Sequence, residues 1–139
     1  MTSVCAEQGE ADPDNTEMDA FLLSLGHLLF RADRQSVISE CCQIAALLTG
    51  KMEYVRCQAI VLREVLLQGR LDINCLSLLD GETKEATRLA FQKEKEDPVE
   101  ASREFGNNCQ LPGSFQGALQ SFLHYRDRQT EQFQAGSVQ

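Results

Sequence analysis

The chain has 139 residues, of which 42% are apolar and 24% are charged, a composition typical of one folded domain rather than of a disordered chain. Its formal net charge of −8 argues against a protein that neutralises nucleic-acid phosphates or lies on an anionic membrane surface. No apolar run approaches the roughly 20 residues that span a bilayer. We therefore expect neither nucleic acid nor a membrane among the partners.

The acidity is concentrated at the beginning of the chain. Residues 1–19 contain six acidic and no basic residues, whereas the rest of the chain is almost balanced. Few of these residues are apolar, which predicts a disordered acidic tail over residues 1–15 that solubilises the protein or contacts a basic partner. The N-terminus also lacks a basic region followed by an apolar segment, so we expect an intracellular protein, cytoplasmic or nuclear, with reduced cysteines.

The first helical pattern begins near Thr16, which together with Asp19 resembles a capping box. Apolar residues then recur every three or four positions, which predicts one buried stripe. This stripe consists of Met18, Phe21, Leu22, Leu25 and Leu29. Asp33 or Ser36 is expected to cap a second helix that ends near Gly50. The stripe of the second helix consists of Val37, Cys41, Ile44, Ala45 and Leu48.

The third predicted helix begins near Lys51 and is the most apolar of all. One face carries Met52, Val55, Ala59, Leu62 and Leu66. Ile60, Val61 and Val65 widen this face until the helix is apolar almost all round. Such a pattern is typical of a central, buried helix, and Gly69 is placed to end it.

Four shorter helical patterns follow. One begins after Asp72 and closes at Gly81, and residues 82–96 form a charged helix expected on the surface. Pro98 favours the start of a helix that stops at Gly106, and Pro112 favours the start of the last one. The inner face of this last helix is expected to carry Phe115, Leu119, Phe122 and Leu123.

No stretch alternates apolar and polar residues as a strand would. The prediction is therefore an all-α fold, a compact array of about five to seven helices that forms a single domain over residues 16–125. The acidic tail 1–15 precedes this domain, and a frayed, polar tail over residues 126–139 follows it.

The residue pattern contains no recognisable catalytic or metal-binding motif. His27 and His124 lie opposite the apolar stripes of their helices, so both are expected to face solvent. The six cysteines include no Cys-x-x-Cys, which argues against a zinc site. We predict no catalytic residue, no metal site and no cofactor. Regulation through the adjacent thiols of Cys41 and Cys42 is kept as an alternative.

Two segments resemble the ADP-ribosylglycohydrolase and J1-crystallin-like family. Segment 105–119 reads FGNNCQLPGSFQGAL, and it is similar to a family segment in which a cysteine, Leu-Pro-Gly, a small residue and Phe open a helix. Segment 54–72, which contains Gln58–Leu62 and Gly69–Asp72, is similar to an upstream helix of the same family.

This resemblance implies an all-α fold and, in active members, a magnesium site that hydrolyses ADP-ribose linkages. The site of those members uses Gly-Asp and Thr-Asp-Asp sequences early in the fold and Gly-Gly-Asp after the Leu-Pro-Gly helix. This chain contains neither a Gly-Asp nor an Asp-Asp pair, and Mg²⁺ needs converging carboxylates. As a relative of this family, the chain would be truncated or degenerate and would lack the metal site.

Abundant apolar helix surface without a catalytic motif predicts a small, non-enzymatic adaptor that binds another protein. The apolar stripes carry more large side chains than a chain of this length readily buries. The candidate interface residues are Phe21, Leu22, Leu28, Leu29, Phe30, Phe115, Phe122 and Leu123. We expect the partner to be a different protein or a second copy of this chain. The alternative function is that of the truncated or degenerate hydrolase relative.

Overall fold

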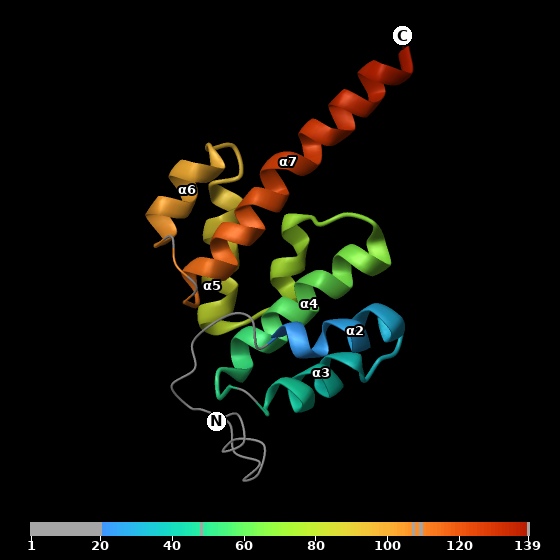
Figure 1. Cartoon of the computed structure of the whole chain (residues 1–139), viewed down its shortest axis with the longest axis vertical. Coiled ribbons are helices and arrows are strands. Elements are labelled where there is room, and N and C mark those ends of the chain that lie inside the picture. Colours follow the sequence, from blue (N-terminus) through green and yellow to red (C-terminus); the bar gives the residue numbers. More distant parts are fainter. Residues whose placement is uncertain (1–20, 48, 107, 109, 139) are drawn as a thin grey trace.

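The computed structural model describes residues 21–47, 49–106, 108 and 110–138, and helices join into an all-α fold without a β-strand in these ranges (Figure 1). The elements in chain order are α2 (Leu22–Arg31), α3 (Val37–Ala45), α4 (Met52–Gln68), the 3₁₀ helix η2 (Ile73–Leu78), α5 (Gly81–Gln92), α6 (Pro98–Phe105) and α7 (Gly113–Val138). The predicted fold class is therefore confirmed. The acidic tail 1–15 and the capping box of Thr16 and Asp19 lie outside the described residues.

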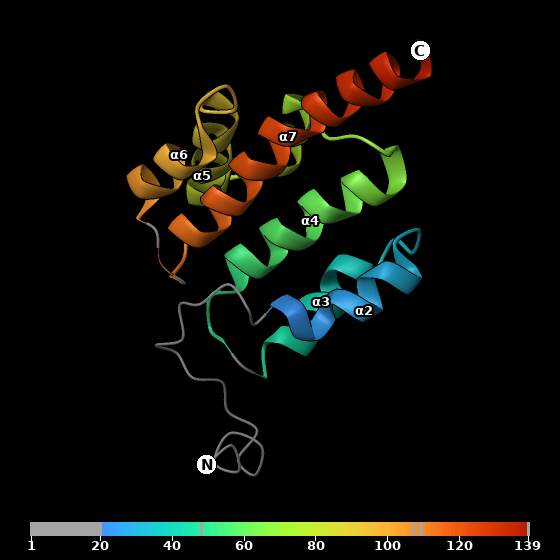
Figure 2. The same ribbon diagram turned by 45° about the horizontal axis from the view of Figure 1, so that its top comes forward.

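Helix α4 occupies the centre of the molecule. Figure 2 shows it between the α2–α3 pair and α7. Val55 and Ala59 belong to a core cluster with α2 and α3, whereas Ile60 and Val61 belong to a second cluster with α5 and α7. Because α4 packs against a core cluster on each of two sides, it must be apolar almost all round, as the sequence predicted. It ends at Gly69, whose φ of 71° lies in the left-handed region that favours glycine.

The first core cluster holds α2 and α3 against α4. Its members from α2, α3 and the residue before α2 are Phe21, Leu28, Val37, Cys41 and Ala45. The predicted stripe of α3 is confirmed at three of these positions. On α2 the buried face is rotated from the predicted stripe, because Ser24 and Leu28 are buried while Leu22 and Leu29 are exposed.

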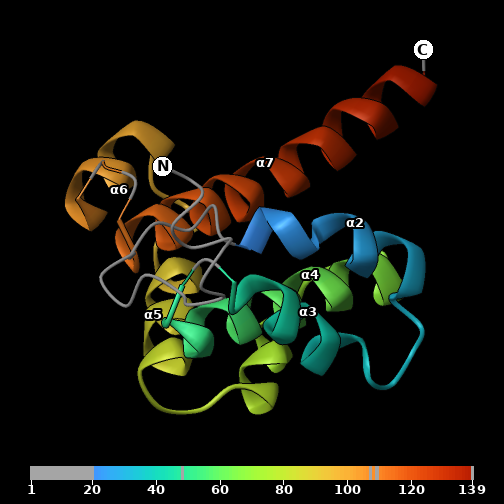
Figure 3. The same ribbon diagram turned by 60° about the horizontal axis from the view of Figure 1, so that its bottom comes forward.

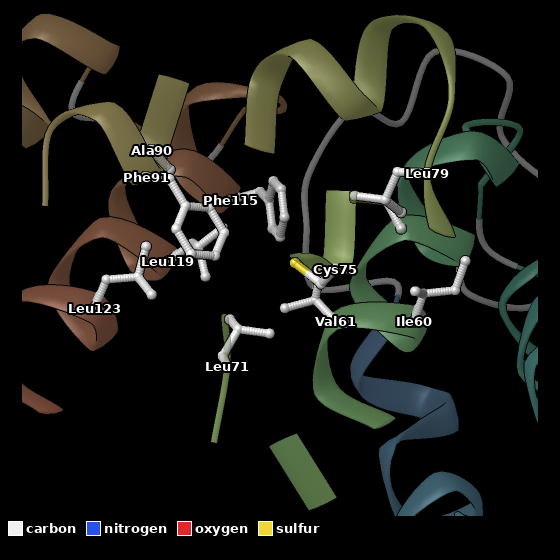
Figure 4. Close-up of a cluster of buried hydrophobic side chains, with 11 residues drawn as sticks. Ile60, Val61, Leu71, Cys75, Leu79, Ala90, Phe91, Phe115, Leu119 and Leu123 are labelled. Atoms are coloured by element: carbon white, nitrogen blue, oxygen red, sulfur yellow. The ribbon is translucent and has the colours of Figure 1, made fainter. Parts of the chain in front are cut away.

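The second core cluster is the larger one and joins α4, η2, α5 and α7. Figure 4 shows Phe91 of α5 beside Phe115 and Leu119 of α7, with Val61 and Leu71 facing them. Helix α5 turns its buried face to this cluster and leaves its charged residues outside. Its predicted place on the surface is thus consistent with its burial pattern.

A polar stripe on α7 attaches this helix to α5 and to the turn that follows α5. The Gln116 Nε2 donates to the carbonyl of Ala86 at 3.1 Å, and the Gln120 Nε2 donates to that of Lys93 at 2.9 Å. The His124 Nδ1 lies 2.9 Å from the carbonyl of Glu94. The three side chains recur every four residues, so they share one face of α7. Helix α7 is therefore held by hydrogen bonds as well as by apolar packing.

Helix α6 begins and ends where the sequence predicted. The Asp97 carboxylate accepts a hydrogen bond from the Glu100 N–H at 3.3 Å, and Pro98 occupies the first turn. Gly106 follows the helix with a φ of 118°. Helix α6 then packs on α7 at Gly117, where a Cβ atom would lie 3.3 Å from the Ser102 hydroxyl. The glycine thus allows the two helices to approach closely.

The last helix is longer than expected. Helix α7 continues to Val138, past the predicted end of the helical domain at residue 125. The segment has no proline after Arg126 and is rich in Gln, which is compatible with a helix. In Figures 1 and 2, the C-terminal half of α7 projects beyond the other helices.

Candidate functional site: an apolar groove between α2, α4 and α7

An apolar hollow with a volume of ≈ 310 Å³ lies where α2, α4 and α7 meet. Figure 3 shows the three helices, and residues of both α2 and α7 line the same hollow. The lining residues are Phe21, Leu22, Leu25, Gln58, Val61, Leu62, Val65, Leu71, Phe115, Ala118, Leu119 and Phe122. None of these side chains is charged, and Gln58 is the only polar one. We call this hollow the apolar groove.

Helix α2 lines the groove because it carries more apolar residues than its core face needs. Leu28 points into the core, whereas Leu22 and Leu25 line the groove. Leu22 is 57% exposed on one rim, and Phe122 of α7 is 42% exposed on the other. Two of the surplus apolar residues, Leu22 and Phe122, thus lie on the two sides of one groove, whereas others such as Phe30 are exposed elsewhere.

Gln58 interrupts the apolar lining contributed by α4. Gln58, Val61, Leu62 and Val65 have the spacing of one helix face, and all four line the groove. Gln58 is only 5% exposed, and neither its Nε2 nor its Oε1 has a hydrogen-bond partner. The sequence analysis missed this residue, although a glutamine within an apolar helical stripe was a signal that could have identified it.

The structure divides the eight predicted interface residues into three groups. Phe21, Leu22, Phe115 and Phe122 come together at the groove, from segments that lie far apart in the sequence. Leu28 and Leu123 are buried in the two cores and do not line the groove, so their assignment to a surface is corrected. Leu29 and Phe30 are exposed but lie outside the groove lining.

Within the first group, exposure differs. Phe21 and Phe115 are buried, as their places on the predicted stripe and inner face implied, and they line the groove while offering little surface to a partner. Leu22 and Phe122 alone of the four offer a large exposed surface. The assignment failed for the buried residues because an apolar stripe alone does not show which part of it the rest of the chain covers.

The two adjacent thiols lie in protein-covered surroundings. Cys41 is fully buried and its Sγ lies 3.8 Å from the carbonyl oxygen of Ser24, whereas Cys42 is half-buried. Burial raises the pKa of both thiols above the ordinary value. A raised pKa disfavours the thiolate, which is the reactive form, so the surroundings supply no activation of these cysteines.

Both histidines contact a neighbouring element, which corrects the prediction that they face solvent. His27 of α2 pairs with Glu40 of α3, and His124 contacts the turn after α5. The Glu40 carboxylate also accepts hydrogen bonds from the Ser36 hydroxyl at 2.8 Å and from Arg34 at 3.2 Å. Hydrogen bonds from His27 and Ser36 lower the pKa of Glu40 to about 2. The helical wheel missed these contacts because it describes each helix without its neighbours.

Among the described residues, no three side chains of the His, Cys, Asp or Glu type are arranged to hold a metal ion. Those residues do not fit the magnesium site that the family resemblance implies. Within the part of the chain that the structure describes, no helix is both long enough and apolar enough to cross a membrane.

Comparison with known proteins identifies no relative. No family model, no curated protein and no solved structure matches the chain.

Proposed function

We propose that this chain is a non-enzymatic adaptor that binds another protein by docking a partner helix in the apolar groove. The observation that carries the proposal is the uncharged groove with Leu22 and Phe122 exposed on opposite rims. Clustered exposed apolar residues around a hollow are typical of interaction sites, because a partner removes their surface from water. A groove between two helices suits the apolar face of a third helix.

The size of the groove suits anchor side chains. A cavity of about 150 Å³ accommodates benzene. The apolar groove, at ≈ 310 Å³, therefore has room for about two large apolar side chains. Buried anchors of this kind provide most of the binding free energy in protein interfaces, whereas the surrounding contacts mainly exclude water.

Site-specific photo-crosslinking tests the proposal. A photoreactive phenylalanine analogue replaces Leu22 or Phe122 on the two rims and, as the control, Val99 of α6, which is exposed but does not line the groove. We expect mass spectrometry of native-cell lysates to find the same partner crosslinked from both rims and not from Val99. Equal crosslinking from the control position, or different proteins from the two rims, would contradict the proposal.

The same experiment identifies a homo-oligomer. Crosslinks from both rims to a second copy of this chain, together with a dimer mass in light scattering, would make the chain its own partner. A monodisperse monomer that forms no crosslinks from either rim would argue against any protein partner.

The hydrolase relative is the second candidate, and the Leu-Pro-Gly segment supports it. Pro112 and Gly113 stand at the start of α7, where the family resemblance places the opening of a helix. Isothermal titration with ADP-ribose in the presence and absence of Mg²⁺ distinguishes the two functions. Saturable, magnesium-dependent binding would favour the hydrolase relative, and no binding would favour the adaptor.

A further inference from the structure

The groove contains one side chain that an apolar docking site does not need. Both polar atoms of Gln58 are buried without a hydrogen-bond partner, in a lining that is otherwise apolar. Such an unsatisfied amide destabilises the free chain, and folded proteins contain few of them. The Gln58 side chain lines the groove, and we expect rotation about its torsions to bring the amide to the groove surface when a partner binds.

We propose that the groove recognises a carboxamide, presented as Asn or Gln within the apolar face of the partner helix. This inference rests on the proposed function and specifies the chemistry of its ligand. A carboxamide donates through its NH₂ group and accepts through its oxygen, so it satisfies the Oε1 and the Nε2 of Gln58 together.

Other polar groups fit the groove less well. A carboxylate or an ammonium group would lose its hydration in a groove whose lining has no charge to compensate it. An ammonium group lacks an acceptor and a carboxylate lacks a donor, so each also leaves one atom of Gln58 unsatisfied. An entirely apolar helix leaves both atoms unsatisfied. A neutral carboxamide avoids both penalties, and its separate NH₂ and oxygen can meet both atoms of Gln58 in nearly linear hydrogen bonds, which the single oxygen of a hydroxyl cannot.

The spacing of the partner residues follows from helix geometry. The groove has room for about two large apolar side chains. On a helix, residues three or four positions before and after a central residue share its face. The recognised segment therefore places Asn or Gln and one large apolar residue, three or four positions apart, inside the groove. A second large apolar residue at the same spacing on the other side of the carboxamide packs against the rim.

Binding of designed helical peptides tests this inference. Three stapled, fluorescein-labelled peptides carry Gln, Leu or Glu between two leucines at this spacing. Each is titrated by fluorescence anisotropy against the full chain, against Gln58→Met and against the control Gln68→Met, which changes an exposed glutamine outside the groove lining on the same helix. We expect the unchanged chain and the control to bind the Gln peptide about fivefold more tightly than the Leu peptide. Gln58→Met should abolish this preference.

A small-molecule probe provides a second readout that does not depend on a protein partner. Benzamide and toluene are titrated separately, while NMR follows the side-chain NH₂ resonances of Gln58. Benzamide should shift these resonances and bind more weakly to Gln58→Met, whereas toluene should bind both proteins similarly. The Gln58→Met chain is checked for folding by circular dichroism before either titration.

The outcomes separate the two proposals. Equal affinity for the Gln and Leu peptides overturns carboxamide recognition but leaves helix docking in place. Benzamide binding that depends on Gln58, without binding of any peptide, supports carboxamide recognition and argues against a partner helix. Absence of binding by all the probes overturns the inference. The inference is also overturned if a second copy of the chain fills the groove, which would appear as a dimer that Leu22→Asp dissociates. It is overturned as well if residues 1–20 of this chain fill the groove, which would appear as NOEs from these residues to Phe122.

Discussion

Two buried glutamines differ in whether their hydrogen bonds are made. Gln116 donates to the carbonyl of Ala86, whereas both polar atoms of Gln58 lack a partner. Their exposed fractions are nearly the same, at 6% and 5%. Because the two glutamines are equally buried, comparing them shows how much the hydrogen bond of a buried amide contributes to stability.

Replacing each glutamine with methionine should change stability in opposite directions. Gln58→Met removes an unsatisfied amide at similar volume, and we expect the free energy of unfolding to rise by about 1–2 kcal/mol. Gln116→Met removes a hydrogen bond and should lower it by about 1 kcal/mol. Urea unfolding followed by circular dichroism measures both changes. A loss of stability in Gln58→Met would show that its amide is satisfied in solution.

Glu40 connects α2 to α3, and its pKa of about 2 makes this connection depend on pH. Because the folded-state pKa lies below the ordinary value of 4.5, the ionised carboxylate stabilises the fold. Its contribution is complete above about pH 4.5 and is lost as the pH falls toward 2. In Glu40→Gln this part of the acid dependence should disappear. Urea unfolding at a series of pH values checks this, and parallel curves for both proteins would contradict it.

At the scale of the helices, replacing Gly26 and Gly113 with alanine should have opposite effects on stability. A Cβ atom on Gly26 of α2 would meet nothing within 4 Å, whereas one on Gly113 would lie 2.1 Å from the Phe105 carbonyl oxygen. Gly26→Ala should stabilise the protein by about 0.5–1 kcal/mol, because alanine has less backbone freedom to lose. Gly113→Ala should destabilise it by about 2 kcal/mol, because the α6–α7 connection must shift. Thermal unfolding measures both, and equal melting temperatures would contradict this prediction.

Local sequence patterns were sufficient to predict some features of the helices but not others. The ends of α4 and α6 at Gly69 and Gly106 are predictable, because each glycine takes a left-handed conformation that most residues avoid. The rotation of the buried face of α2 was not predictable, since this helix has apolar residues in more than one direction. The length of α7 was underestimated because a polar composition was read as fraying, although polar residues with good helix propensity extend a helix.

At the scale of the whole molecule, α4 links two core clusters that would otherwise be separate. Leu28 lies in the cluster with α2 and α3, and Leu123 lies in the cluster with α7. Because both clusters contain residues of α4, we expect one cooperative unfolding transition for the domain.

Truncation of either leucine tests this cooperativity. Leu28→Ala and Leu123→Ala should each lower the free energy of unfolding by about 2–5 kcal/mol. Native-state hydrogen exchange should show that Leu28→Ala also reduces protection of the buried amides of α7. Unchanged protection there would show that the α2–α3 pair unfolds independently.

The amino-acid sequence alone determined the all-α class, the central position of α4 and the ends of several helices, because each depends on periodicity or on one conformationally special residue. Tertiary packing decided that Leu22 and Phe122 border one groove, that His27 contacts Glu40, and that Gln58 is left without a partner. Periodicity describes each helix about its own axis, whereas these three features depend on which neighbour covers each face.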